Sequence, residues 1–285
     1  MFSQIVDIFK LRISVLMAVT ALAGFAVTPG ESLSSLQMLA LALTVLGASA
    51  AAGAFNQYAE RDLDARMERT KNRAFVTGAA SHGQGWLCLI ACLLLLSVGL
   101  ASWVFNIAVG FHVFMGAFTY GIIYTLWLKR RTAWNIVIGG AAGSFAVLAG
   151  ASAADPALSM PSILLAVVLF LWTPPHFWAL AIVLHKDYAN AGVPMLPVVK
   201  GDAAAAKIIL LNIIALVAVS LLPGFYGMGW VYLTGASIGG AYFIYKGIHL
   251  VRNPNPKTAI RCFLASLVQL TLLLITAMID PHIIG

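Results

Sequence analysis

The sequence predicts an all-α polytopic membrane protein, a bundle of nine transmembrane helices around a central cavity that opens near the cytoplasmic side. Hydrophobic residues make up 61% of the 285 residues and charged residues only 9%, whereas a soluble domain is about 45–50% apolar. The apolar residues form nine runs, most of them close to the roughly 20 residues that a helix needs to cross a bilayer. Together with the one-sided distribution of basic residues, these observations predict one membrane domain, residues 1–285, without a soluble module.

The predicted spans are connected by loops of very different length. Two loops on the basic side are long, about 59–82 after the second span and 185–206 after the sixth, and long polar loops in an otherwise economical bundle are where function is expected. The inner ends of the second and sixth spans are the least sharply defined, because polar residues begin inside the helical pattern. The spans are expected at about 11–29, 35–58, 83–103, 107–127, 132–153, 160–184, 206–223, 228–247 and 259–279.

All 17 Lys and Arg residues fall on one side of the membrane when the loops are assigned alternately. The opposite loops hold only Glu31 and Asp155, with Asp280 near the end. The positive-inside rule then predicts a cytoplasmic N-terminus, and an odd number of spans an external C-terminus. This topology accounts for the net charge of +7, so no nucleic-acid partner is expected. Without an Arg- and Ser-rich transit segment, the bacterial cytoplasmic (inner) membrane is the expected location.

The two cysteines of the third predicted span share one helix face. Cys88 and Cys92 could form a redox pair or bind a metal, but cysteine is also a common small buried hydrophobe. We interpret them as buried packing residues.

The segment that follows the second span carries the densest group of charges. Between Glu60 and Arg73 lie four carboxylates and five basic residues. On a helix Asn56, Glu60 and Asp64 are spaced by four, and each such step turns about 400°, so the three side chains share a face. Amide and carboxylate oxygens suit Mg²⁺, and polar groups beside an apolar span are usually functional. The alternative is a solvated helix end with local ion pairs.

Asp62 lies about 240° around the helix from Asn56. In a continuous helix it misses the shared face and can pair with Arg66 at i+4; if the helix unwinds there, it can join the metal. Carboxylates beside several cations suit a diphosphate, which needs both a bridging metal and direct charge neutralisation. The cations that follow within about two turns are Arg66, Arg69, Lys71 and Arg73.

The sixth predicted span contains Pro174-Pro175 followed by His176. Two prolines should kink or break a helix, and broken membrane helices are tolerated where they line a cavity. We therefore expect His176 to face a cavity, the alternative being a buried histidine bonded to backbone. At the inner end of the span, Lys186 is a candidate for phosphate and Asp187 for a second Mg²⁺, unless both belong to surface ion pairs.

A third polar segment ends the fourth span. Tyr120 and Tyr124 share a helix face that points toward the basic side and can reach a substrate. Lys129, Arg130 and Arg131 follow, and three consecutive cations are also typical of positive-inside anchoring.

Together these segments resemble one family, the protoheme IX farnesyltransferases (haem O synthases), a branch of the intramembrane prenyltransferases. The resemblance rests on Glu60–Arg73, on Tyr124-Thr-x-x-Leu-Lys-Arg-Arg-Thr-x-Trp-Asn, and on Pro175-His-Phe-Trp-Ala-Leu with Lys186-Asp-Tyr-x-x-Ala-Gly-x-Pro-Met-Leu-Pro-Val, and it covers essentially the whole chain. Two positions depart from related patterns. Glu60 replaces a common Asp, and Ala191 stands where quinone-type relatives have a second Asp after Asp187.

The resemblance implies transfer of a farnesyl group from farnesyl diphosphate to the 2-vinyl group of haem B, giving haem O. It also implies Mg²⁺ as cofactor, the lipid bilayer as environment and a downstream haem-modifying enzyme as a possible partner. The implied metal ligands and catalytic residues are Asn56, Glu60, Asp64 and Asp187. The implied diphosphate ligands are Arg69, Arg73, Lys129, Arg130 and Lys186, and the implied haem or substrate contacts are His176, Tyr120 and Tyr124.

Three other functions are compatible with parts of the pattern. The nearest is an enzyme of the same fold with another acceptor, an aromatic quinone precursor or a chlorophyll-type ring. A transporter would also have broken helices and polar groups at the midplane, but it should show inverted repeats, and the chemistry here gathers at one rim. A haem carrier without catalysis would not need the carboxylate face.

Overall fold

The computed structural model describes residues 2–284, and within that range the chain is helical with no β-strand. Met1 and Gly285, the outermost residues of the predicted domain, lie outside the described residues. The long helices are α2 (Leu11–Ala26), α3 (Ser35–Ala59), α6 (Gln84–Val104), α7 (Ile107–Phe118), α9 (Ala141–Ala154), α10 (Met160–Val183), α13 (Asp202–Leu221), α14 (Trp230–Arg252) and α15 (Pro256–Ile284). The short elements are α1 (Phe2–Ile8), α4 (Arg61–Asp64), α5 (Ala74–Thr77), the π-helix η1 (Thr119–Leu128), α8 (Asn135–Gly139), α11 (His185–Asn190), α12 (Leu196–Lys200) and the 3₁₀-helix η2 (Leu222–Tyr226).

Seven helical stretches of the described chain are long and apolar enough to cross a membrane. They include α7 continued by η1, α8 with α9, and α13 continued by η2. The other two predicted spans correspond to α2, which has only 16 residues, and to α14, which is not among the seven. The chain is therefore a multi-span membrane protein, and the count of nine spans stays a prediction.

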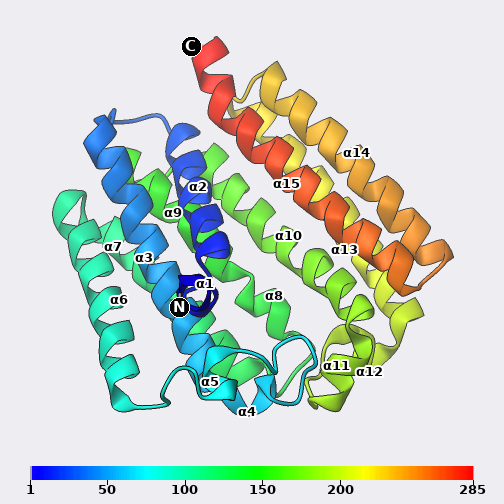
Figure 1. The fold of residues 1–285 in the computed structure, drawn as a ribbon. Coiled ribbons are helices and arrows are strands. Elements are labelled where there is room, and N and C mark those ends of the chain that lie inside the picture. The colour runs from blue at the N-terminus through cyan, green and yellow to red at the C-terminus, as the bar shows by residue number, and fades with distance from the viewer. Residues whose placement is uncertain (1, 285) are drawn as a thin grey trace.

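The helices pack as two neighbouring groups (Figure 1). One apolar cluster joins α2, α3, α6, α7 and α9, and a larger one is centred on α10, α13, α14 and α15. Helix α2 crosses α9 closely at two glycines. A Cβ at Gly24 would clash with the Val147 carbonyl, and a Cβ at Gly150 would clash with the Ala21 carbonyl. Such contacts between small residues replace the hydrophobic driving force that is absent between helices in lipid.

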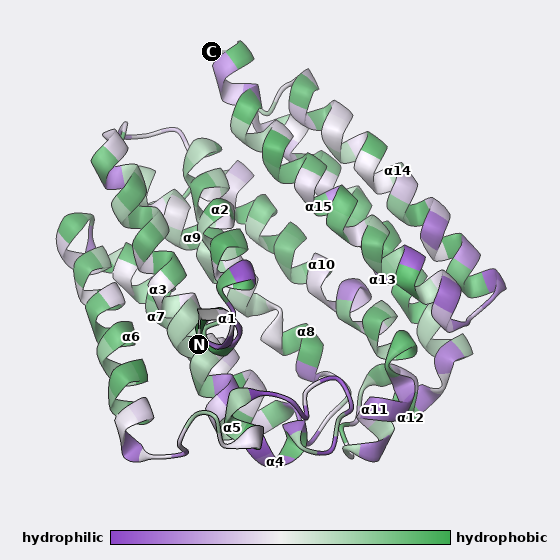
Figure 2. Cartoon of the chain, viewed as in Figure 1, coloured by the Kyte–Doolittle hydropathy of each residue, from purple (hydrophilic) through white to green (hydrophobic). Residues whose placement is uncertain are grey.

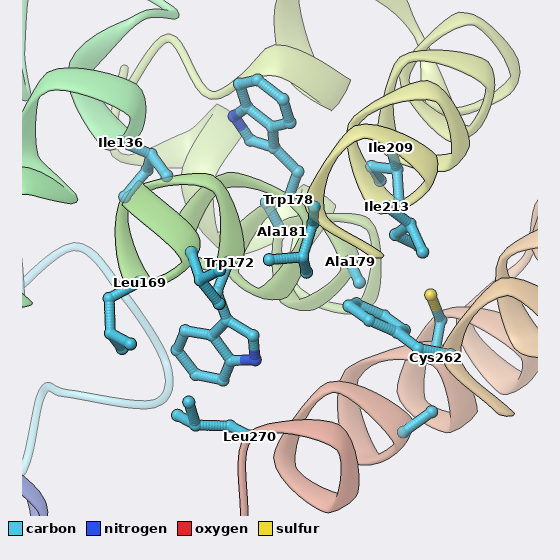
Figure 3. Packing of buried hydrophobic residues seen from close by; sticks show 14 of the residues in the cluster. Ile136, Leu169, Trp172, Trp178, Ala179, Ala181, Ile209, Ile213, Cys262 and Leu270 are labelled. Atoms are coloured by element: carbon cyan, nitrogen blue, oxygen red, sulfur yellow. The ribbon is translucent and has the colours of Figure 1, made fainter. Parts of the chain in front are cut away.

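Helix α10 runs without interruption through Pro174 and Pro175, so of the predicted kink or break the break is wrong, and the kink stays a prediction. The two prolines lack the amides that would bond to the Phe170 and Leu171 carbonyls, and packed neighbours let proline be accommodated in membrane helices. Figure 3 shows the surrounding packing, in which Trp172 belongs to one apolar cluster with residues of α13 and α15.

Hydrophilic residues gather at one end of the bundle, around α4, α5, α11 and α12 (Figure 2). Both long polar loops reach this end, as their predicted common side requires. A separate hollow of about 580 Å³ lies among Glu31, Asn106 and Asp155, which the sequence assigns to the opposite side. The predicted central cavity itself stays a prediction. Cys88 and Cys92 lie exposed on α6, so their expected burial is wrong: among the described residues no helix covers them.

Candidate functional site

The side chains that the sequence predicts on one helix face, Asn56, Glu60 and Asp64, are all buried, at 1–2% exposure. Helix α3 ends just before Glu60, whose backbone (φ −100°, ψ 16°) departs from helical geometry. The amide of Glu60 nevertheless bonds to the Asn56 carbonyl (3.0 Å), and the amide of Asp64 to the Glu60 carbonyl (2.8 Å). The i, i+4, i+8 spacing therefore survives the break between α3 and α4, as the sequence predicted.

Each of these three side chains is bonded to a cation from another part of the chain. We call the six residues the paired row. Its cations come from the turn before α2, from the residue after η1 and from the loop before α5. The pairs are Lys10 Nζ to Asn56 Oδ1 (2.6 Å), Lys129 Nζ to Glu60 Oε2 (2.5 Å) and Arg73 Nη1 to Asp64 Oδ2 (2.8 Å).

The donor atoms of the paired row fit a hard divalent cation. All three are amide or carboxylate oxygens, which Mg²⁺ prefers, and Glu60 Oε1 is buried without a hydrogen-bond partner. Each of these oxygens already accepts a hydrogen bond from a positively charged side chain, Lys10, Lys129 or Arg73, so the oxygens favour a cation as partner. Because the carboxylates face those cations rather than one another, no group of three His, Cys, Asp or Glu side chains within residues 2–284 forms a ready metal shell. The Mg²⁺ ligand roles therefore stay a prediction.

The π-helix η1 brings its polar side chains to the same place. Its wider turn makes i→i+5 bonds, and the amide of Lys129 bonds to the Tyr124 carbonyl at 2.9 Å. The Thr125 hydroxyl donates to the Tyr120 carbonyl (2.8 Å) and accepts from Asn56 Nδ2 (2.9 Å). The rings of Tyr120 and Tyr124 stack at 5.5 Å, so they share a face as predicted. π-helical turns are frequent at functional sites, but nothing in the sequence marks this one.

Lys10 is a site residue that the sequence reasoning missed. The charge pattern predicts only that Lys10 is one of the cytoplasmic cations, yet its Nζ donates to Asn56 Oδ1 and to the Tyr120 hydroxyl (2.9 Å). Its backbone is left-handed, at φ 47° and ψ 43°. Burial, with a contribution from nearby Arg73, lowers the pKa of Lys10 to about 8. The one signal in the sequence is a basic residue just before a span, which equally predicts a membrane anchor.

A more exposed ion pair lies at the rim of the site. Arg130 Nη1 and Nη2 bond to the two carboxylate oxygens of Asp62 at 2.8 and 2.7 Å. As predicted for a helix that continues, Asp62 does not join the oxygens of the paired row, but its partner is Arg130 rather than Arg66. The bond from Arg130 lowers the pKa of Asp62. The predicted diphosphate role of Arg130 stays a prediction.

The second loop meets the first through Asp187. Its Oδ2 accepts from the backbone amide of Arg69 at 3.4 Å, so the candidate second metal ligand lies against the loop that carries Arg69 and Arg73. Lys186 is exposed on α11. The structure thus brings Asp187 and Arg69 together, and it gives Lys186 no partner among the described residues.

His176 lies inside the bundle, 7% exposed. Its ring is stacked between Trp172 (4.2 Å) and Phe263 (4.4 Å). Its Nδ1 lies 2.6 Å from the Ser266 hydroxyl, which itself donates to the Phe263 carbonyl at 2.6 Å. A hydroxyl has one proton to donate, so Ser266 must accept from an N–H on Nδ1. The neutral imidazole therefore carries its lone pair on Nε2.

The polar surroundings of His176 are neutral. Trp172 Nε1 donates to the Ser266 carbonyl at 2.9 Å. One turn further along α15, Gln269 is fully buried, and neither of its side-chain polar atoms has a hydrogen-bond partner. We call Trp172, His176, Phe263 and Ser266 the neutral cluster.

Comparison with known proteins places this geometry in a family. The family model described as the UbiA prenyltransferase family matches residues 17–273. Two relatives from Paramagnetospirillum magneticum, named protoheme IX farnesyltransferase 2 and protoheme IX farnesyltransferase 1, are 55% and 44% identical; the alignments cover 98% and 99% of this chain and 97% and 99% of the relatives.

Solved structures agree with this fold at low sequence identity. The solved structure of a digeranylgeranylglyceryl phosphate synthase superimposes with a TM-score of 0.81 at 18% identity, over 98% of both chains. A UbiA homologue from Archaeoglobus fulgidus bound to DMAPP and Mg²⁺ gives 0.70 at 15% identity, over 95% of this chain and 99% of that chain. With a family model that spans most of its length and relatives this similar, the chain belongs to the UbiA prenyltransferase family.

Proposed function

We propose that this prenyltransferase transfers a farnesyl group from farnesyl diphosphate to the 2-vinyl group of haem B and so forms haem O. The observation that carries the proposal is the paired row, a buried set of carboxylate and amide oxygens interleaved with three cations. Such a set suits a metal-bound diphosphate. The name shared by the relatives at 55% and 44% identity supports farnesyl as donor and haem as acceptor.

The diphosphate would be held by side chains of the paired row and of the loops around it. Asn56, Glu60 and Asp64 would hold Mg²⁺, and Asp187 on the facing loop is suited to a second ion. When bound, Mg²⁺ would neutralise diphosphate oxygens and stabilise the charge of the leaving group. The residues that would contact the diphosphate directly are Arg69, Arg73, Lys129, Arg130 and Lys186.

The chain promotes loss of diphosphate chiefly through fixed positive charge. As the bond between farnesyl C1 and the ester oxygen breaks, negative charge grows on the diphosphate, and preorganised cations such as Lys129 and Arg73 stabilise it. Tyr120 and Tyr124 form an aromatic wall beside the developing allylic cation. The apolar surroundings exclude water until the vinyl carbon has attacked that cation. Water then adds to the resulting haem-side cation, releases a proton and leaves a hydroxyethyl group.

His176 is the candidate contact to haem. Its Nδ1–H is committed to Ser266, so the neutral ring offers only a lone pair on Nε2. That atom can ligate iron, but it cannot donate a hydrogen bond to a propionate. For His176 as a haem contact, either an axial ligand or a propionate contact, the geometry therefore favours the axial ligand. An oxygen partner on the other ring nitrogen is also typical of metal-bound histidines.

The proposed setting is the bacterial cytoplasmic membrane, with the N-terminus and the paired row on the cytoplasmic side and the C-terminus outside. This orientation rests on the positive-inside rule and on the gathering of hydrophilic residues at one end of the bundle (Figure 2). A diphosphate made in the cytoplasm would then reach the site directly. Haem O would leave toward a downstream haem-modifying enzyme, the one protein partner that we propose.

The test is an assay of the purified protein with haem B, farnesyl diphosphate and Mg²⁺, followed by mass spectrometry. Haem O should form and should disappear with EDTA and in Glu60→Gln and Asp64→Asn. If product forms from an aromatic quinone precursor or a chlorophyll-type ring and none from haem B, the proposed acceptor is wrong and that compound takes its place. Folded protein that makes no product with any prenyl diphosphate would overturn the proposed enzyme.

A further inference from the structure

Lys10 has binding capacity that its neighbours do not use. An ammonium group has three N–H donors, and two of them are given to neutral acceptors, Asn56 Oδ1 and the Tyr120 hydroxyl. Among the described residues no carboxylate lies within 4.0 Å of the Lys10 nitrogen. The other two cations of the paired row, Lys129 and Arg73, are each paired with a carboxylate. One donor and a full positive charge therefore remain available to an anion.

The backbone holds Lys10 in place at some conformational cost. Within residues 2–284 only Lys10 and Leu158 adopt positive φ without being glycine, and strained backbone of this kind clusters at functional sites. Helix α3 makes room for the side chain at Gly53. A Cβ there would come within 3.2 Å of the Lys10 Cβ and 3.3 Å of the Phe9 carbonyl oxygen. A lysine that served only as a surface anchor would need neither feature.

The position of Lys10 along the paired row indicates which part of a substrate it meets. Asn56 lies inside α3, Glu60 follows the end of α3, and Asp64 lies in the short helix beyond it. The Asn56 end therefore lies nearest the membrane interior. A prenyl chain is apolar and must extend in that direction. The phosphate that carries it would thus sit beside Lys10, and the distal phosphate beside Lys129 and Arg73.

We propose that Lys10 is a substrate-binding residue whose ammonium group contacts the phosphate that carries the prenyl chain. This inference rests on the proposed function. It adds Lys10, from a turn at the N-terminal end of the first predicted span, to the five cations already proposed for the diphosphate. It also places a positive charge next to the ester oxygen of the leaving group.

The test measures ligand affinity by calorimetry in detergent, without turnover. The ligands are farnesyl monophosphate and the unreactive farnesyl thiolodiphosphate, each with Mg²⁺. Lys10→Met should weaken both by about 10–100-fold, the range expected for a lost charge-assisted hydrogen bond. Arg12→Met removes an exposed cation two residues away and is the matched control, with a change below about twofold.

A second variant separates binding from folding. Lys10→Gly relieves the left-handed backbone, so its thermal stability should equal or exceed that of Lys10→Met, while its affinity for both ligands should be equally poor. Wild-type affinity in both Lys10 variants would overturn the proposal for Lys10 alone. Weaker binding of the thiolodiphosphate with unchanged monophosphate affinity would overturn the contact to the prenyl-bearing phosphate. If the wild-type protein binds neither ligand, the proposed function falls as well.

Discussion

The paired row and the neutral cluster are both buried, but only the paired row carries formal charge. Its oxygens meet cations from three segments, two of them distant in sequence, whereas His176 is held by a serine hydroxyl and two aromatic rings. A buried charge costs several kcal/mol unless it is paired, and a membrane interior supplies no water to pair with it. Charge is therefore concentrated at the hydrophilic end of the bundle, and the helix interior uses neutral polar groups.

The largest expected effect comes from placing a charge on the buried face of α15, one turn beyond the neutral cluster. Gln269 is fully buried, so Gln269→Glu should destabilise the protein by about 3–5 kcal/mol as an uncompensated charge. Thermal denaturation in detergent would measure the loss. The matched control, Gln269→Leu, should cost nothing or stabilise, since neither polar atom of Gln269 has a partner. A leucine variant as unstable as the glutamate variant would mean that Gln269 has a required polar contact.

Removing a carboxylate charge from the paired row should impair the reaction, and it should also cost stability, because Lys129 loses its countercharge. Glu60→Gln keeps an acceptor for Lys129 but weakens metal and charge stabilisation, and we expect haem O formation to fall by about 10²–10³-fold. Rates measured across a Mg²⁺ titration check this. Glu68→Gln is the control, because Glu68 lies in the same loop, is exposed and pairs only with Lys71. Equal losses in both variants would show that the rate follows loop charge and not the paired row.

A smaller effect should follow from removing the hydrogen-bond acceptor that fixes the tautomer of His176. Ser266→Ala removes the acceptor of the Nδ1–H, and partners of this kind are typically worth 10–100-fold in metal affinity. Haem titration should therefore show affinity weaker by about tenfold and a shifted Soret band, and Ser266→Thr should retain both. An unchanged Soret band in Ser266→Ala, combined with a lost one in His176→Ala, would assign the orientation of the ring to its stacking partners.

The smallest effect concerns the exposed pair at the rim. Arg130 lowers the pKa of Asp62 below its ordinary value of 3.8. The pair therefore contributes its stability above that value and loses it as the pH falls through the lower folded-state pKa. Because the Asp62 side chain is 54% exposed and the Arg130 side chain 41% exposed, the pair adds only about 0.2–1 kcal/mol to the free energy of unfolding. Asp62→Asn should be slightly less stable than wild type at pH 7, and the difference should vanish in acid and shrink in high salt.

The sequence by itself determined the membrane class, the approximate positions of the spans and the shared face of Asn56, Glu60 and Asp64. These features depend on local quantities. Hydropathy over about 20 residues and a period of 3.6 residues per turn need no knowledge of the rest of the chain. The stacked tyrosines were predictable for the same reason, because they are four residues apart.

Only the tertiary structure decided which groups meet. Lys10 and Tyr120 are 110 positions apart, Glu60 and Lys129 are 69 apart, and His176 and Ser266 are 90 apart. No spacing rule in a single sequence links residues so distant. The π-helical turn of η1 and the unbroken course of α10 through two prolines also depend on neighbours, since the packing around these helices comes from distant parts of the chain. Partner choice, and with it the tautomer of His176 and the unused donor of Lys10, is therefore a property of the folded bundle.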